Sequence, residues 1–227
     1  MIPARMGSTR LAKKNLALLN GKPLISYAIA AARETGVFDR VVVNSEHPVF
    51  SEIAGRYDAE FYLRPEKLGG SAIKSDDVVY DFMIHNPGDM TAWVNSTSPL
   101  QTAEEVKKVV DFFERQNLDS LITIREEQVH CLYGGKPLNF SEEGLFAQTQ
   151  DLVPVQCFVY SIMMWRNKAF LRAYEKQGHA FFCGKTGYYP VSRESALIVK
   201  TEEDFHLIES IMIGKQTNLK KDIIYDS

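Results

Sequence analysis

The first 33 residues of the chain carry cations but no carboxylates. Their basic side chains are Arg5, Arg10, Lys13, Lys14, Lys22 and Arg33. Gly7 and Ser8 let the backbone turn there and expose its N–H groups. Such donors, together with Arg and Lys, suit a triphosphate, whose charge must be neutralised before an oxyanion approaches. A solvated basic loop is the alternative, because both the Walker A pattern and GxGxxG are missing from this stretch.

A loop of this kind must be positioned by a sheet, and the pattern of the first half of the chain predicts one. Apolar runs predict strands at 40–44, 59–63, 90–95 and 119–124, and helical patterns lie at 23–33, 47–57, 73–86 and 102–116. This alternation predicts an α/β fold, with a mostly parallel sheet and helices on both faces. Ligands of such sheets bind beyond the carboxyl ends of the strands. Ile2 and Pro3 would end the first strand there and lead into the basic loop.

Three residues mark predicted helix starts. Pro23 suits the first position of its helix, and Thr102 has capping-box spacing to Glu105. Thr201 is predicted to cap a last helix at 201–212, which follows a strand in "ESALIVK".

The second half of the chain interrupts this alternation. Turn formers in "YGGKPLNFSEEGLFAQTQ" precede the apolar "VQCFVYSIMMW". We expect an insertion with its own hairpins at about 125–180, which would serve as a dimer arm. The remainder of 1–214 would complete a single domain, and 215–227 reads as a polar tail.

Composition limits the classes of function. A net charge of -3 over 227 residues argues against broad nucleic-acid binding, so any anion site must be local. Cys131, Cys157 and Cys183 are widely spaced and indicate reduced thiols of a cytoplasmic protein. We expect neither a membrane span nor an export signal, because the sequence has no apolar run of sufficient length and no cationic leader.

The stretch "IPARMGSTRLAKKN" resembles the opening signature of the acylneuraminate cytidylyltransferases, IPARxGSxxxxxKN. The cytidylyltransferases for 3-deoxy-manno-octulosonate share a looser version. The resemblance covers about the first 125 residues, including "FDRVVVNSE", "FYLRPEKLGG", "SDDVVYDFM" and "STSPLQTAEEV", and resumes in "HAFF" and "ESALIVKTEEDF". It implies a Rossmann-like nucleotidyltransferase fold, a homodimer and a role in cell-surface polysaccharide biosynthesis. The implied reaction is attack by a sugar-acid hydroxyl on the α-phosphate of CTP, with release of pyrophosphate.

The resemblance also assigns roles to single residues. It implies nucleotide binding by Arg5, Ser8, Lys14, Asn15, Arg64 and Ser75. Among these, Lys14 and Arg5 would be catalytic, with Lys14 stabilising charge at the α-phosphate. A surface lysine and an arginine stacked on the surface are the alternatives for Lys14 and Arg64.

A second group of residues matches positions that would bind the acceptor sugar. These are Asn95, Thr97, Ser98, Phe181 and Phe182. An ordinary polar turn is the alternative for the first three residues, and a core aromatic pair is the alternative for the last two. The family commonly has Gln-Pro where this chain has Asn95-Ser96, so the acceptor contact of the shorter Asn95 is in question.

The sequence departs from the family at its metal site. Ile198, Val199 and Lys200 stand where the family has Asp-x-Asp, whose carboxylates would converge on Mg²⁺. The usual Asn-Gly is also missing from "PVQCFVYSI". We therefore expect no strong protein metal site, with Mg²⁺ delivered by CTP and Lys200 as a substitute charge. A nucleotide-binding homologue with little or no turnover is the alternative.

The start of the chain leaves two alternatives open. Only Met1 and Ile2 precede "PAR", whereas a strand is typically about five residues long. The first strand is either truncated or preceded by residues that are missing from this sequence.

Overall fold

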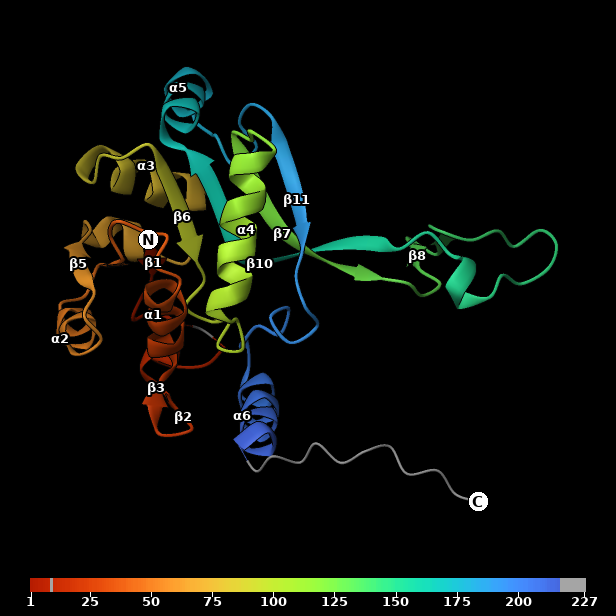
Figure 1. Cartoon of the computed structure of the whole chain (residues 1–227), viewed down its shortest axis with the longest axis horizontal. Coiled ribbons are helices and arrows are strands. Elements are labelled where there is room, and N and C mark those ends of the chain that lie inside the picture. The colour runs from red at the N-terminus through yellow and green to blue at the C-terminus, as the bar shows by residue number, and fades with distance from the viewer. Residues whose placement is uncertain (9, 217–227) are drawn as a thin grey trace.

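The computed structural model describes residues 1–8 and 10–216 (Figure 1). Most of the predicted polar tail at 215–227 lies outside these ranges, and Lys215 and Gln216 form the end of the last helix. No helix in the described ranges is both long and apolar enough to cross a membrane.

The centre of the fold is a sheet built from two parts. β1 (Ile2–Pro3), β4 (Val42–Ser45) and β5 (Glu60–Leu63) pair in parallel, in the order β1-β4-β5. The second part has the order β11-β7-β10-β6 and contains β6 (Met90–Val94), β7 (Ser120–Glu127), β10 (Val155–Arg166) and β11 (Thr186–Pro190). The Met1 ammonium donates to the Ala92 carbonyl at 2.8 Å, and the Val94 N–H donates to the Met1 carbonyl at 3.0 Å. These two hydrogen bonds join the parts into the order β5-β4-β1-β6-β10-β7-β11.

β10 departs from the parallel pattern, since it runs antiparallel to both β6 and β7. It follows β7 through a long hairpin, so the chain returns in the opposite direction. β11 then pairs in parallel with the outer side of β7.

Helices cover both faces of the sheet. α1 (Leu24–Glu34), α2 (Val49–Arg56) and α4 (Ala103–Arg115) pack on one face, and α3 (Ser75–His85) and α5 (Asn167–Gln177) pack on the other. Successive strand residues alternate between these layers, as side chains on a strand must. Val43 packs in the cluster of α1 and α2, whereas Val42 packs in the cluster of α3 and α5.

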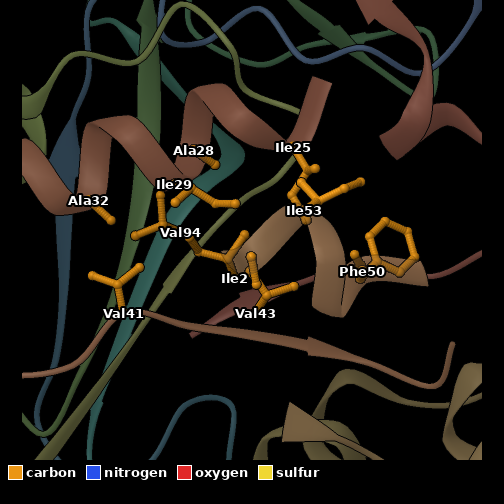
Figure 2. Close-up of a cluster of buried hydrophobic side chains, with 12 residues drawn as sticks. Ile2, Ile25, Ala28, Ile29, Ala32, Val41, Val43, Phe50, Ile53 and Val94 are labelled. Carbon is orange, nitrogen blue, oxygen red and sulfur yellow. The ribbon is translucent and has the colours of Figure 1, made fainter. Parts of the chain in front are cut away.

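Figure 2 shows the first of these layers from close by. Ile2, Val43 and Val94 project from the strands toward the two helices. They meet Ile29 of α1 and Ile53 of α2 in a cluster that holds β1 firmly in the sheet. The carboxyl end of β1, where the basic loop begins, is therefore fixed by buried apolar contacts.

Short elements complete the chain. They are the paired strands β2 (Leu18–Leu19) and β3 (Lys22–Pro23), the paired strands β8 (Leu132–Tyr133) and β9 (Lys136–Pro137), and 3-10 helices at Lys14–Leu16, Glu66–Gly69 and Thr149–Asp151. The last helix, α6 (Glu202–Gln216), packs near β2 and β3 through a cluster that includes Leu19, Val199 and Ile208.

The four strands and four helices predicted in the first half are confirmed, with shifted ends. Pro23 is not the first helical residue, because it pairs with Leu18 in extended conformation and α1 begins at Leu24. Thr102 caps α4 by accepting the Glu105 N–H at 3.2 Å. The Glu105 carboxylate does not complete the capping box but accepts the Ser192 N–H instead.

The predicted strand in "ESALIVK" is wrong. The N–H groups of Ala196 and Leu197 donate to carbonyls of Ser192 and Glu194, so the segment begins with a local turn. The rest is irregular and touches the edge of the site through Val199. Thr201 does cap α6, through a hydrogen bond from the Asp204 N–H to its hydroxyl.

An arm projects from the body between β7 and β10 (Figure 1). It contains β8, β9 and the 3-10 helix Thr149–Asp151, and it lies within the segment at which we expected an insertion. Large apolar side chains are exposed along it: Val129, Leu132, Tyr133, Leu138, Leu145, Phe146 and Val153. α5, later in the same segment, packs against α3 in the body instead. The dimerisation role of the arm stays a prediction.

Candidate active site

A cavity of about 310 Å³ lies where the basic loop leaves β1. Its walls come from the loop after β1, the start of α3, the segment after β5 and the end of β6. They include Arg5, Ser8, Arg10, Lys14, Asn15, Arg64, Ser75, Trp93, Ser96 and Thr97. Four basic residues thus meet at the carboxyl edge of the parallel strands, where this class of sheet binds ligands.

Lys14 lies in the wall of this cavity at the start of a 3-10 helix. Lys13 before it has φ 48°, a left-handed conformation that is uncommon outside glycine. The Lys14 ammonium donates to the Val199 carbonyl at 2.7 Å. Burial, with added repulsion from Arg10 and Arg5, lowers the pKa of Lys14 from 10.5 to about 8. A buried cation among other cations is destabilised in its charged form, and a phosphate bound beside it would stabilise that form.

Arg64 and Glu46 form a buried pair beneath the basic loop. The Arg64 guanidinium donates to the Ala4 carbonyl at 2.8 Å, to the Asn44 carbonyl at 3.0 Å and to Glu46 Oε2 at 2.7 Å. The other carboxylate oxygen of Glu46 accepts the Met6 N–H at 2.8 Å. The pair therefore fixes the loop after β1 to the ends of β4 and β5.

Arg5 and Asn15 are held more loosely. Arg5 donates to the Gly70 carbonyl at 3.5 Å, and Asn15 Nδ2 donates to the Arg5 carbonyl at 3.4 Å. Asn15 Oδ1 is buried and has no hydrogen-bond partner among the described residues. Both distances are at the long end for hydrogen bonds, so these side chains can change partners when a ligand enters.

A chain of hydrogen bonds lies behind Thr97, which lines the cavity. Asn95 Nδ2 donates to the Tyr160 carbonyl at 3.1 Å, and Asn95 Oδ1 accepts both the N–H and the hydroxyl of Thr97. The Thr97 carbonyl accepts the Val199 N–H at 2.9 Å. Since the Val199 carbonyl accepts from Lys14, these hydrogen bonds link β10 to the basic loop.

This arrangement of basic residues at the end of β1 agrees with a match in sequence. Residues 1–175 match the family described as Cytidylyltransferase. The chain belongs to the cytidylyltransferase family. The resemblance drawn from the opening signature is thereby confirmed.

Two relatives are N-acylneuraminate cytidylyltransferases. That of Streptococcus agalactiae serotype V is 27% identical over 239 residues, which cover 99% of this chain and 56% of the relative. That of Escherichia coli O18:K1:H7 is 24% identical, covering 100% of this chain and 54% of the relative. The chain spans about half the length of these relatives. The post-translational flagellin modification protein B of Campylobacter coli is 24% identical, covering 96% of this chain and 95% of that protein.

Solved structures share the fold. CMP:2-keto-3-deoxy-manno-octonic acid synthetase, in complex with CTP, has a TM-score of 0.73 at 14% identity and covers 94% of this chain and 97% of that one. 4-Diphosphocytidyl-2C-methyl-D-erythritol synthase of Anaerococcus prevotii has a TM-score of 0.65 at 11% identity, covering 93% and 96%. The predicted Rossmann-like nucleotidyltransferase fold is thereby confirmed.

All six residues predicted to bind nucleotide meet in this cavity. Arg5, Ser8, Lys14, Asn15, Arg64 and Ser75 all line it. Thr97, predicted to bind sugar, lines it as well. Their individual roles stay predictions.

The other predicted sugar-binding residues lie outside the cavity walls. Asn95 uses both polar atoms of its side chain within the protein, and Ser98 is buried. Phe181 packs its ring edge-on against Trp165 at 5.5 Å, which favours the core alternative for this residue. Phe182 is 55% exposed and lies 6.1 Å from the Phe158 ring. Lys200 lines a separate cavity.

Sequence reasoning missed several residues of the site, among them Arg10, Glu46 and Trp93. Glu46 follows β4 within the quoted "FDRVVVNSE", and its position at the carboxyl end of a buried strand could have marked it. Trp93 belongs to a predicted strand, but periodicity gave no indication that its side chain reaches the cavity. Both contacts depend on neighbours distant in sequence.

The side chains around Lys200 do not fit a resident Mg²⁺ ion. In the described ranges no group of three or more His, Cys, Asp or Glu residues is arranged to hold a metal. The Asp204 carboxylate has one oxygen that already accepts from the Lys200 N–H, the Thr201 N–H and the Thr201 hydroxyl. Mg²⁺ requires several oxygen ligands in near-octahedral geometry, and an isoleucine and a lysine supply none.

Proposed function

We propose that the chain transfers CMP from CTP to a sialic-acid-like nonulosonate. The observation that carries this proposal is the convergence of Lys14, Arg5, Arg10 and Arg64 on one cavity in a member of the cytidylyltransferase family. A hydroxyl oxygen of the sugar acid forms a bond to the α-phosphorus of CTP. The bond from that phosphorus to the α–β bridging oxygen breaks, pyrophosphate leaves with the electron pair, and the hydroxyl proton passes to solvent.

Lys14 and Arg5 are the residues we propose to be catalytic. Both line the cavity, and each is held by one hydrogen bond from its side chain to a backbone carbonyl. Phosphate oxygens would replace these carbonyls as charge-assisted partners. Charge on the α-phosphate grows in the transition state, so Lys14 would contribute most there.

The remaining nucleotide contacts would come from Ser8, Asn15 and Ser75, with Arg64 holding the loop from beneath. Ser75 is the first residue of α3, so its helix presents free N–H groups and a positive dipole end to an anion. Thr97 would face the acceptor from the opposite wall.

We further propose that Mg²⁺ arrives with CTP and is held by the phosphates. The protein supplies no fitting carboxylates at Ile198 and Lys200. Lys200 is the last of the charges that act on the pKa of Lys14, after burial, the two arginines and the opposing charge of Asp204. Its proposed part as a substitute charge rests on this proximity to Lys14.

Assembly and location belong to the same proposal. The apolar side chains exposed on the arm, such as Leu145 and Phe146, would be covered by a second copy of the chain in a homodimer. A cytoplasmic location fits the three free cysteines, Cys131, Cys157 and Cys183. The product would there supply cell-surface polysaccharide biosynthesis.

A second biological context is favoured by one observation. The match to the flagellin modification protein covers nearly all of that relative, whereas the N-acylneuraminate enzymes extend well beyond the matched region. An activated sugar destined for flagellin is therefore the alternative to a polysaccharide precursor. An octulosonate acceptor and a homologue with little turnover remain the alternatives for the activity.

The experiment is pyrophosphate release from CTP across a panel of nonulosonates and octulosonates, with Lys14→Ala as the matched inactive control. We expect release with a nonulosonate that depends on CTP and falls strongly in the variant. Release without preference for cytidine would contradict the family-based assignment of the base. CTP binding without release from any acceptor would support the non-catalytic alternative.

A further inference from the structure

The active-site cavity contains a cation to which the opening signature assigns no role. Arg10 lines the cavity together with Arg5, Lys14 and Arg64. In the pattern IPARxGSxxxxxKN, however, Arg10 stands at one of the variable positions. Its place in the cavity follows from the course of the basic loop and not from the signature.

The four cations of the cavity differ in how far the protein itself engages them. Arg64 donates three hydrogen bonds, and Lys14 and Arg5 each donate one to a backbone carbonyl. Within the described residues, the Arg10 side chain has neither a hydrogen-bond partner nor an ion-pair partner. All of its N–H donors are therefore free to bind a ligand.

The surroundings of Arg10 are strongly cationic. Among the charges that lower the pKa of Lys14, that of Arg10 acts most strongly and exceeds that of Arg5. The acid-free opening of the chain supplies no carboxylate to offset this repulsion. The nearby Glu46 carboxylate already accepts from Arg64 and from a backbone N–H. A bound polyanion would relieve the repulsion between these cations.

Burial arranges the cations from the floor of the cavity to its opening. Arg64 is 4% exposed, Lys14 is partly buried and Arg10 is exposed. A triphosphate with its α-phosphate at Lys14 would extend its other phosphates toward solvent, because pyrophosphate has to leave through the opening. The exposed cation is therefore the one placed to meet the terminal phosphates.

We propose that Arg10 is a further catalytic residue, whose guanidinium binds the β- and γ-phosphates of CTP and stabilises the departing pyrophosphate. This inference rests on the proposed function and deepens it. As the bond from the α-phosphorus to the bridging oxygen breaks, the electron pair stays on that oxygen and negative charge grows on the β-phosphate. Arg10 donates hydrogen bonds to oxygens of this phosphate and remains protonated, so it transfers no proton.

The chemistry of the leaving group explains why an arginine suits this position. Negative charge on the departing pyrophosphate must be stabilised in the transition state. Ile198 and Lys200 supply no carboxylate that would hold a metal ion beside it. A guanidinium offers permanent positive charge and paired N–H donors that match two phosphate oxygens at once. Arg10 thus contributes stabilisation that does not depend on metal-binding carboxylates.

The test measures equilibrium binding by calorimetry, so it does not depend on turnover. The probes are inorganic pyrophosphate, CTP and CMP, titrated into the full chain without added metal. Arg10→Ala should weaken the binding of pyrophosphate and CTP about tenfold, the value of one charge-assisted hydrogen bond, and leave CMP affinity within about twofold. Arg10→Lys keeps the charge but loses the planar fork, so its affinities should lie between those of the wild type and Arg10→Ala.

Two controls separate this role from a general effect of charge or folding. Lys22→Ala removes an exposed cation of the same acid-free opening that does not line the cavity, and it should change none of these affinities. Arg10→Ala should keep a melting temperature close to that of the wild type, because Arg10 has no hydrogen bond or ion pair with the described residues to lose.

Turnover provides a second readout. Arg10→Ala should lower kcat by about 10²-fold, since it removes a donor that acts mainly on charge developing in the transition state. Methylguanidinium added to the assay should restore part of this loss in Arg10→Ala and have no such effect in Lys14→Ala. A residue that only supported folding would not respond to the added ion.

Each outcome decides the inference. Selective loss of pyrophosphate and CTP affinity in Arg10→Ala, without turnover by the wild type, would support binding of the terminal phosphates by Arg10 and contradict the proposed activity. Turnover by the wild type, with kcat and all affinities unchanged in Arg10→Ala, would overturn the inference and keep the activity. Equal losses for CMP and pyrophosphate would also overturn it, because Arg10 would then not distinguish the terminal phosphates from the α-phosphate.

Discussion

Binding of CTP should draw a proton from solvent onto Lys14. In the free protein the pKa of this ammonium is lowered to about 8, first by burial and then by Arg10 and Arg5. A triphosphate brings several negative charges beside it, and one unit charge at 4 Å contributes about 4 kcal/mol at an effective dielectric constant of about 20. After discounting for screening in a cavity open to solvent, we expect the pKa of Lys14 to rise by at least about one unit in the complex.

The size of the effect follows from these two values. With a pKa of about 8 in the free protein and about 9 in the complex, proton uptake peaks at roughly half a proton per CTP near pH 8.5. The affinity for CTP should fall about tenfold between about pH 7 and 10, because the neutral amine binds the triphosphate less well. The phosphates of CTP contribute little in this range, since their last pKa is about 6.

Calorimetry in two buffers of different ionisation enthalpy measures this uptake directly at several pH values. Lys14→Arg is the matched control, because arginine stays charged over the whole range and should abolish both the uptake and the decline in affinity. Zero proton uptake at about pH 8.5, or an affinity that stays constant from about pH 7 to 10, would refute the placement of this ammonium against the triphosphate.

Four further predictions concern turnover, stability and assembly. Lys14→Ala should lower kcat by about 10²–10³ and CTP affinity by only about tenfold, and equal losses in steady-state and binding assays would make it a ground-state contact alone. Lys14→Met should raise the melting temperature by roughly 2–8 °C at neutral pH, because the lowered pKa of this half-buried ammonium corresponds to about 1–2 kcal/mol of lost folding stability after discounting for exposure. This increase in melting temperature should disappear as the pH rises from about 8 to 10.5, where the ammonium is neutral in both the folded and the unfolded protein. An increase that persists at high pH would contradict an ionic origin. Arg64→Ala should weaken CTP binding and also lower the melting temperature by roughly 6–12 °C, since it leaves Glu46 buried without its partner. An unchanged transition in calorimetric scans would show that the pair does not stabilise the loop. Leu145→Asp should shift the protein toward a monomer in analytical ultracentrifugation, and an unaltered dimer would exclude this part of the arm from the interface.

Much of the sheet could be predicted because its elements depend on local patterns. Val42 and Val43 serve opposite faces of a buried strand, and this double burial appears in the sequence as an apolar run. The antiparallel course of β10 was not predicted, because it follows from a hairpin whose length cannot be derived from periodicity. The segment 194–200 was wrongly predicted as a strand for a related reason. Its apolar residues are buried in an irregular conformation, and an apolar run in the sequence does not distinguish a buried irregular segment from a strand.

The site was predictable where residues are adjacent in sequence. Arg5, Ser8 and Lys14 share one loop, so their spacing and the family signature placed them together. The partnership of Arg64 with Glu46 and the location of Lys200 in a second cavity depend on tertiary contacts that no short motif encodes. Sequence alone therefore predicted which residues of the basic loop lie together, but not the residues that hold the loop in place.

The hydrogen bond from Lys14 to Val199 joins residues 185 positions apart. During synthesis at about 5–20 residues per second, the basic loop leaves the ribosome roughly 10–40 s before Val199, whose carbonyl accepts from Lys14. The loop and β1 can form early, but until Val199 is synthesised the Lys14 ammonium lacks the carbonyl to which it donates. The nascent chain therefore cannot form this contact of Lys14 until Val199 has left the ribosome, so termination before Val199 would leave the cavity without it.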